Sequence, residues 1–336
     1  MIRSKLLVIA AALATTAALA VSPAVASASL TGAGSTLVAP LMANWTSGFE
    51  SGGGTSVKYS AVGSGTGIAQ ITARTVDFGA SDAPLTNEQA NACGGCVQIP
   101  WALSATGVGI NVPGVSKLNL SGALLAEIYL GKIKKWNDAK IAKANPKAHL
   151  PSTRITPVYR SDGSGDTYAF TGFLSKVSPA WRSQVGVGTT VGFKAGVGAK
   201  GNSGITSTVS KTPGAIGYVS ASYLIAAGLK AAAIQNQAGN YEYPNLKNIE
   251  SAAATVTHVP ANNAISIVNP PSSAKLAYPI STFTYAIVPH DAPQKTAVRE
   301  FITYGITKGQ AYGAALDFAP LPQVVLQAAQ KALSSL

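Results

Sequence analysis

The fold class of this protein follows from one stretch of its sequence, Val158-Tyr-Arg-Ser-Asp-Gly-Ser-Gly-Asp-Thr-Tyr-Ala-Phe-Thr-Gly-Phe-Leu-Ser175. Its first residues end an apolar strand, a glycine-rich turn follows, and Thr167–Ser175 has the spacing of a helix with a buried apolar face. The same order recurs along the chain. Strands are predicted at Val57–Val62, Val76–Ala80, Thr106–Val112, Ala215–Val219 and Thr282–Val288, and helices at Pro40–Glu50, Gly67–Ala73, Gly122–Leu130, Ala297–Tyr304 and Val324–Ala332. Thr86-Asn-Glu-Gln89 has the pattern of a capping box, which begins a further short helix. This alternation predicts an α/β protein with largely parallel sheets covered by helices.

The composition disfavours several classes of protein. The length of 336 residues indicates two domains. Because 11% of the residues are charged and 47% are hydrophobic, a disordered chain or a coiled coil is not expected. The net charge is +12, but the densest basic cluster, Lys132-Ile-Lys-Lys-Trp136, is short and is interpreted as a solvated turn. Because the sequence has no basic helix or stripe, we expect no nucleic-acid partner.

Residues 1–28 are predicted to be an export signal. Arg3 and Lys5 precede the apolar run Leu6–Val21, and A-x-A-like cleavage sites end at Ala26 and Ala28. Cleavage after Ala28 would leave a mature charge of +12 − 2 = +10. The signal predicts export to the periplasm, the cell envelope or the extracellular space. Because no cysteine stands at the cleavage point, we expect no lipid anchor.

Export also guides the interpretation of Cys93-Gly-Gly-Cys96. Zinc would need further cysteine or histidine ligands, and His149, His258 and His290 are scattered along the chain. A redox pair would favour a helix N-terminus, whereas this pair lies in a polar turn. We therefore expect a local disulfide and no metal site.

Four turns combine glycine with small hydroxyl residues at a strand end or a helix start. They are Thr31-Gly-Ala-Gly-Ser-Thr36, Val62-Gly-Ser-Gly-Thr-Gly67, Phe78-Gly-Ala-Ser-Asp82 and Arg160-Ser-Asp-Gly-Ser-Gly-Asp166. Glycine lets the backbone approach a ligand, and the first N–H groups of a helix attract anions. Hydroxyl groups add neutral donors, and an arginine can bind two oxygens at once. Together these turns predict a site for a compact oxyanion.

The familiar catalytic and nucleotide motifs are absent from these turns. Gly63–Gly67 lacks the spacing of a dinucleotide loop, and the chain has no Gly-Lys-Ser/Thr sequence of a P-loop. The stretch from Asp162 resembles the start of a calcium loop but has Thr167 and Phe173 where glycine and glutamate belong. Ser164 has no nucleophile elbow and no positioned histidine. We therefore expect neither an enzyme nor a cofactor.

Longer motifs in a fixed order resemble those of the extracytoplasmic phosphate-binding proteins of phosphate ABC transporters, the PstS-like family. They are Leu30-Thr-Gly-Ala-Gly-Ser-Thr36, Thr75-Val-Asp-Phe-Gly-Ala-Ser-Asp-Ala-Pro-Leu85, Ile128-Tyr-Leu-Gly-Lys-Ile-Lys-Lys-Trp-Asn137, Arg160-Ser-Asp-Gly-Ser-Gly165, Gly201-Asn-Ser-Gly204, Pro213-Gly-Ala-Ile-Gly-Tyr-Val219 and Tyr278-Pro-Ile280. The resemblance implies the two-lobed periplasmic-binding-protein fold of type II, with a ligand cleft between lobes joined by two hinge strands. One lobe would comprise residues 29–107 and 282–336, and the other residues 108–281.

The resemblance also implies a function. A monomer would bind inorganic phosphate with high affinity outside the cytoplasmic membrane and deliver it to the permease and ATPase subunits of an importer. The alternative is an exported surface protein of the same fold that binds another oxyanion or acts in adhesion.

By resemblance, the phosphate ligands would be Thr36, Leu37 through its backbone, Ser64, Asp82, Arg160, Ser164, Gly165 and Asp166. Asp82 would discriminate between anions, because a carboxylate repels sulfate but can accept the proton that phosphate carries. Asp162 would orient Arg160 or simply form the turn.

The sequence departs from the family pattern at two positions. Leu37 stands where an aromatic residue is frequent, which matters little if only its N–H binds. Asp166 stands where a threonine is usual, and Thr167 is an alternative source of that hydroxyl. The Asp166 side chain could turn outward and cap the helix, or face the cleft and repel the anion. The outward orientation is expected, because a helix N-terminus favours a carboxylate.

Overall fold

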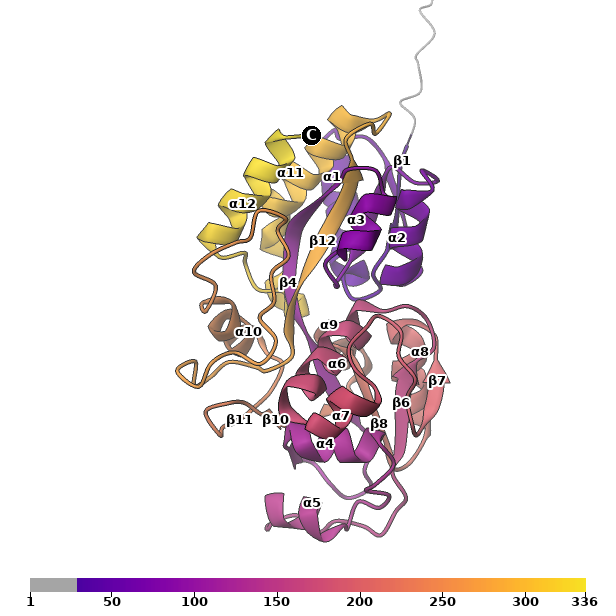
Figure 1. Ribbon diagram of the computed structural model, residues 1–336, viewed down its shortest axis with the longest axis vertical. Helices are drawn as coiled ribbons and strands as arrows, with labels where there is room; N and C mark the ends of the chain where they lie inside the picture. The colour runs from indigo at the N-terminus through magenta and orange to yellow at the C-terminus, as the bar shows by residue number, and fades with distance from the viewer. Residues whose placement is uncertain (1–28) are drawn as a thin grey trace, which may run out of the picture.

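A computed structural model describes residues 29–336, so the predicted export signal lies outside the described residues. The chain forms two α/β lobes stacked along the long axis of the molecule (Figure 1). One nine-stranded mixed sheet runs through both lobes. Its strands follow the order β2 (Val57–Ala61), β1 (Leu30–Gly34), β3 (Phe78–Ser81), β12 (Ser281–Pro289), β4 (Cys96–Ile110), β8 (Ala215–Ser220), β6 (Thr156–Arg160) and β7 (Val197–Ala199), and β9 (Lys230–Ala231) pairs with β4. None of the helices within the described range combines the length and the apolarity needed to cross a bilayer.

The upper lobe in Figure 1 is built around three parallel strands, β1 (Leu30–Gly34), β2 (Val57–Ala61) and β3 (Phe78–Ser81). Helices cover this part of the sheet: α1 (Ala39–Ser51), α2 (Ser64–Thr72), α3 (Asn87–Ala92), α11 (Lys295–Ile306) and α12 (Gln323–Ser334), with 3-10 turns at Lys308–Tyr312 and Ala314–Leu316. Its core contains edge-to-face aromatic pairs, including Trp45 with Trp101 at 5.3 Å between ring centroids. The predicted capping box at Thr86 is confirmed, since Thr86 and Gln89 exchange side-chain bonds to each other's backbone N–H.

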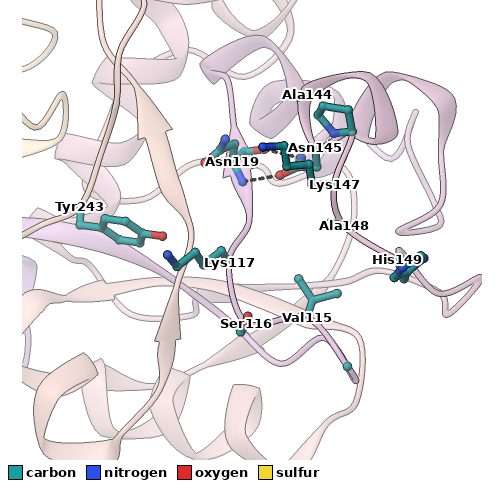
Figure 2. Close-up of a pocket in the computed structure, with 12 residues that line it drawn as sticks. Val115, Ser116, Lys117, Asn119, Ala144, Asn145, Lys147, Ala148, His149 and Tyr243 are labelled. Carbon is teal, nitrogen blue, oxygen red and sulfur yellow. Dashed lines mark hydrogen bonds between the residues drawn. The ribbon is translucent and has the colours of Figure 1, made fainter.

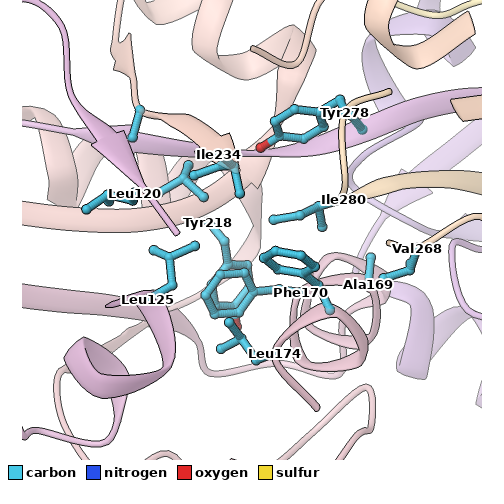
Figure 3. Close-up of a cluster of buried hydrophobic side chains, with 14 of the residues drawn as sticks. Leu120, Leu125, Ala169, Phe170, Leu174, Tyr218, Ile234, Val268, Tyr278 and Ile280 are labelled. Carbon is cyan, nitrogen blue, oxygen red and sulfur yellow. The ribbon is translucent and has the colours of Figure 1, made fainter. Parts of the chain in front are cut away.

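The lower lobe is built around β6 (Thr156–Arg160), β7 (Val197–Ala199) and β8 (Ala215–Ser220). Its helices are α4 (Gly122–Tyr129), α5 (Ala139–Ala144), α6 (Gly165–Val177), α7 (Pro179–Gln184), α8 (Gly201–Lys211), α9 (Ala221–Ala227) and α10 (Leu246–Ala253). A second sheet joins β5 (Asn119–Leu120), β10 (Ala233–Gln235) and β11 (Tyr241–Glu242). Figure 3 shows the apolar core, where Phe170 of α6 stacks on Tyr218 of β8 at 4.5 Å between ring centroids.

Two long strands pass between the lobes. The first is β4 (Cys96–Ile110), which pairs with β12 (Ser281–Pro289) as far as Ala105 and with β8 from Thr106 onward. β4 therefore belongs to the sheet of both lobes, and β12 brings the chain back to the upper one. The lobe boundaries at residues 107/108 and 281/282 stay a prediction.

Two sequence predictions need correction here. The strand predicted at Thr106–Val112 begins ten residues earlier, at Cys96, because both of its faces are covered and Pro100 obscures the pattern. The sheets were predicted to be largely parallel, but β12 runs antiparallel to β3 and β4, and β4 runs antiparallel to β8. The reason is that the chain passes between the lobes in both directions on adjacent strands.

Cys93 and Cys96 form a disulfide in the turn between α3 and β4. The Arg74 guanidinium lies beside it, with Nη2 donating to the Cys93 carbonyl at 3.0 Å and to Asp291 through an ion pair of 3.1 Å. The disulfide closes a loop of only three residues, so it contributes to the local turn.

Replacing Phe170 by Ala should destabilise the protein, because the ring is fully buried and contacts both Tyr218 and Tyr129. We expect a loss of about 3–5 kcal/mol in the free energy of unfolding, measured by urea titration with circular dichroism. Ile225→Ala is the control, since Ile225 is 52% exposed and should cost less than about 0.5 kcal/mol. Equal stability of the two variants would contradict this description of the core.

Candidate functional site

The predicted ligand residues converge where the two lobes meet. From the upper lobe come the loop after β1, the first turn of α2 and the loop after β3, and from the lower lobe comes the turn between β6 and α6. All eight residues are buried: Thr36, Leu37, Ser64, Asp82, Arg160, Ser164, Gly165 and Asp166. The structure therefore brings together residues that lie up to 130 positions apart in the sequence.

Hydrogen bonds join the two lobes at this point. The Gly65 N–H donates to the Gly163 carbonyl at 3.0 Å, and the Gly165 N–H donates to Ser64 Oγ at 3.1 Å. On the other side, Asn202 Nδ2 donates to Thr36 Oγ1 at 2.9 Å. The turns from the two lobes are thus in direct contact, and the predicted ligand residues lie buried at this contact.

Glycine makes this close approach possible. A Cβ atom at Gly165 would lie 2.3 Å from the Cβ of Asp82, and one at Gly63 would lie 2.5 Å from Asp162 Oδ2. Gly63 also has a φ of 94°, which a residue with a side chain rarely adopts. The glycines of these turns are therefore required by contact between the lobes.

Arg160 is the cation of the site, and its guanidinium is 1% exposed. Asp162 binds it through two bonds, with 2.7 Å between Arg160 Nε and Asp162 Oδ1, and a second bond joins Nη2 to Oδ2. Burial alone would lower the pKa of Arg160, but the bond to Asp162 and the charges of Asp166 and Asp162 raise it above the usual value. Burial alone would raise the pKa of Asp162, but Arg160 lowers it. The orienting contact proposed for Asp162 is thus present.

Asp82 is a buried carboxylate surrounded by hydroxyl groups. Its Oδ1 accepts bonds from Ser35 Oγ at 2.5 Å and Thr284 Oγ1 at 3.1 Å. Burial, reinforced by the charge of Asp166, raises the pKa of Asp82 to about 7, although the two hydroxyls and Arg160 act in the opposite direction. Asp82 therefore holds a proton to higher pH than an exposed aspartate does.

The outward orientation predicted for Asp166 is wrong. Its side chain is fully buried, and its carboxylate accepts bonds from Thr106 Oγ1 at 2.8 Å, Asn202 Nδ2 at 2.8 Å and Arg160 Nη1 at 3.2 Å. The physical reason is that Ser164 already caps α6 by accepting a hydrogen bond from the Thr167 N–H. The three buried donors around Asp166 would lack a partner if its carboxylate turned outward. Burial raises the pKa of Asp166, and Arg160, Thr106 and Asn202 oppose that shift.

Several residues of the site were not identified from the sequence. They are Ser35, Thr106, Asn202, Tyr218 and Thr284. The motif Gly201-Asn-Ser-Gly204 was the available indication for Asn202, because it begins a helix with small polar residues. Ser35 and Tyr218 lie within the quoted motifs at residues 30–36 and 213–219, but no role was assigned to them, whereas Thr106 and Thr284 lie within strands and belong to none of the quoted motifs. Thr167, considered as a substitute hydroxyl, instead bonds to the Tyr218 hydroxyl at 2.7 Å.

A surface pocket of about 720 Å³ lies elsewhere, beside the C-terminal end of α5 (Figure 2). Its lining includes Lys117, Lys147, His149 and Tyr243, together with Asn119 and Asn145, which bond to each other. None of the predicted ligand residues contributes to this pocket. Within residues 29–336, no group of three or more His, Cys, Asp or Glu side chains could hold a metal ion.

Replacing Gly165 by Ala should prevent the cleft from closing on a ligand, because the new Cβ would overlap Asp82 in the opposite lobe. We expect a folded variant, judged by circular dichroism, that loses about tenfold or more in affinity for phosphate, the ligand implied by the resemblance. Gly172→Ala in the same helix is the matched control, since its Cβ would meet nothing closer than 3.9 Å. Calorimetry that finds the same affinity in both variants would contradict the closed contact.

Comparison with known proteins identifies relatives over most of the chain. The sequence matches the PBP superfamily domain over residues 20–308. It is 39% identical to phosphate-binding protein PstS of Xylella fastidiosa (strain Temecula1) over 301 residues, covering 88% of this chain and 82% of that protein. It is also 39% identical to PstS of Pasteurella multocida, covering 90% and 88%, and 34% identical to PstS of Methanocaldococcus jannaschii, covering 76% and 72%.

Solved structures confirm the two-lobed fold. A high-affinity periplasmic phosphate-binding protein, PfluDING, solved with phosphate, aligns with a TM-score of 0.74 at 24% identity, covering 90% of this chain and 93% of that one. A phosphate-binding protein from Stenotrophomonas maltophilia aligns with a TM-score of 0.71 at 20% identity and the same coverage. With relatives at this identity over this share of both sequences, the chain belongs to the PstS family of phosphate-binding proteins in the PBP superfamily.

Proposed function

We propose that this protein binds inorganic phosphate outside the cytoplasmic membrane and delivers it to the permease and ATPase subunits of an ABC importer. The observation that supports this most directly is the convergence of donors from both lobes on one buried point. Those donors are hydroxyl groups, backbone N–H groups at the start of α2 and α6, and the guanidinium of Arg160. A compact tetrahedral oxyanion is the ligand that such a set fits.

Asp82 supports phosphate over other oxyanions. Its Oδ2 has one contact, a 3.4 Å approach from Ser64 Oγ, so this oxygen retains the capacity to accept a proton from a ligand. Phosphate carries such a proton at neutral pH, whereas sulfate does not. An ionised Asp82 would therefore attract the first anion and repel the second.

The charge distribution supports an anionic ligand and a place on an anionic envelope. Residues 108–281 contain 17 Lys and Arg against 6 Asp and Glu, a net charge of +11. Residues 29–107 and 282–336 contain 6 against 7, a net charge of −1. A lobe of such strong positive charge attracts anions over long distances and accelerates their binding. The same charge would hold an exported, unanchored monomer against an anionic cell envelope.

The names of the relatives support the same function. The relatives named above are called phosphate-binding proteins. The alternative of an exported surface protein that binds another oxyanion is therefore not favoured.

The proposal is tested by calorimetry of the exported chain with phosphate, arsenate and sulfate. We expect tight binding of phosphate and arsenate, which carry a proton, and no measurable binding of sulfate. Arg160→Lys should bind phosphate at least about tenfold more weakly, because lysine lacks the planar fork. Lysine is preferred to alanine as the test, since alanine would leave the carboxylates of Asp162 and Asp166 buried without a cation. Sulfate binding as tight as phosphate binding would overturn the proposal.

Replacing Asp82 by Asn should narrow the preference for phosphate over sulfate. The amide has the same shape but no negative charge, and it can donate a hydrogen bond to an anion that lacks protons. We expect the ratio of the two dissociation constants to fall by about tenfold or more at neutral pH, measured by competition calorimetry. Glu300→Gln, at an exposed position in α11, is the control for loss of one charge. An unchanged ratio in Asp82→Asn would refute the discriminating role of this carboxylate.

A further inference from the structure

The carboxylate of Asp166 occupies a donor of Arg160 that a bound anion would also use. Asp162 uses Arg160 Nε and one N–H of Nη2, and Asp166 uses an N–H of Nη1 at 3.2 Å. A guanidinium has five N–H groups, so two remain for any ligand. Asp166 is therefore placed as an internal competitor for the cation of the site.

The other partners of Asp166 also belong to the proposed phosphate site. Asn202 Nδ2 donates to Asp166 Oδ2 at 2.8 Å and to Thr36 Oγ1 at 2.9 Å. Thr106 Oγ1, on β4 where that strand enters the lower lobe, donates to the second carboxylate oxygen at 2.8 Å. One carboxylate thus contacts groups from β4, β6 and α8. A change in its charge would alter its hydrogen bond to Arg160 and, through Asn202, the hydrogen bonding of Thr36.

The charge of this cluster opposes a second anion. It contains one cation, Arg160, and three carboxylates, those of Asp82, Asp162 and Asp166. Asp162 is held ionised by its two bonds to Arg160, which leaves Asp82 and Asp166 as the pair that can change charge. Adding phosphate to this buried cluster increases the repulsion between like charges, which a low-dielectric site screens poorly.

We propose, building on the proposed function, that Asp166 makes phosphate binding depend on proton uptake, so that the protein captures phosphate more tightly in mildly acidic surroundings. The Asp82–Asp166 pair takes one proton from solvent as phosphate enters. Protonation of Asp166 weakens its hold on Arg160, frees the Nη1 donor for a phosphate oxygen and turns the carboxyl into a hydrogen-bond donor. Because the pair takes up only one proton, its other carboxylate stays ionised and can accept the proton of phosphate itself.

The groups that face Asp166 from the surrounding elements agree with this direction. Arg160 and Asp162 face it from the end of β6, Asp82 from the loop after β3, Tyr218 from β8 and Tyr223 from α9. Burial raises the pKa of both tyrosines, so they remain neutral below pH 8. Burial also raises the pKa of Asp166, and that of Asp82 to about 7, and a bound anion raises both further. A group that gains a proton on binding makes affinity fall as pH rises.

The test is calorimetry with inorganic phosphate from pH 5 to 8 on the wild-type protein, Asp166→Asn and Asp166→Thr. Titrations in two buffers of different ionisation enthalpy count the protons taken up. We expect wild-type affinity to fall about tenfold more than that of either variant between pH 6 and 8, and wild type to take up close to one additional proton near pH 7. The titration of free phosphate affects all three proteins alike and cancels in the comparison.

The outcomes separate this inference from the function on which it rests. Glu300→Gln, which removes an exposed carboxylate, should follow the wild-type pH curve. Equal slopes and equal proton uptake in wild type and both Asp166 variants would overturn the role of Asp166 and leave phosphate binding intact. Failure of all the proteins to bind phosphate at every pH would overturn the proposed function. Two variants are used so that the comparison survives if one of them does not fold.

Discussion

A guanidinium that is 1% exposed keeps its charge only if carboxylates and hydrogen bonds replace the water it has lost, and the site of this protein is built on that requirement. Arg160 ends β6 and is held by Asp162 from the following turn and by Asp166 from the first turn of α6. The hydroxyl of Tyr218, on the neighbouring strand β8, accepts a hydrogen bond from the backbone N–H of Arg160. The same tyrosine stacks on Phe170, so the charged site and the apolar core of the lower lobe share a residue.

Contact between the lobes depends on glycine residues, which have no side chain, as well as on hydrogen-bonding side chains. The turns at Gly63–Gly65 and Gly163–Gly165 approach each other through backbone atoms and a serine hydroxyl. Such contacts form only when both turns are correctly placed, and β4, which pairs with β12 and then with β8, supplies the common frame. In the proposed function, the lobes would separate and close about β4 and β12, the strands that pass between them.

The site combines attraction and repulsion in a small volume. Arg160 and the N-terminal N–H groups of α2 and α6 attract an anion, while Asp82 and Asp166 oppose one. In an exposed site, this opposition would be weakened by solvent and salt. In the proposed phosphate site, which is buried, this opposition would favour anions that carry protons, or conditions in which the protein itself carries them. The basic lower lobe would contribute long-range attraction, and the buried carboxylates would discriminate between anions.

The sequence by itself determined the α/β class, the positions of the strand–turn–helix units and the turns that would meet at a site. These features depend on local properties, namely apolar periodicity, glycine in turns and capping residues such as Thr86. The tertiary structure alone decided the full length of β4, the antiparallel pairing of β12, and the participation of Ser35, Thr106, Asn202 and Thr284. It also decided the orientation of the Asp166 side chain. A local argument favoured a helix cap, but three donors from β4, β6 and α8 offered the carboxylate stronger partners, and no pattern within a short stretch of sequence contains them.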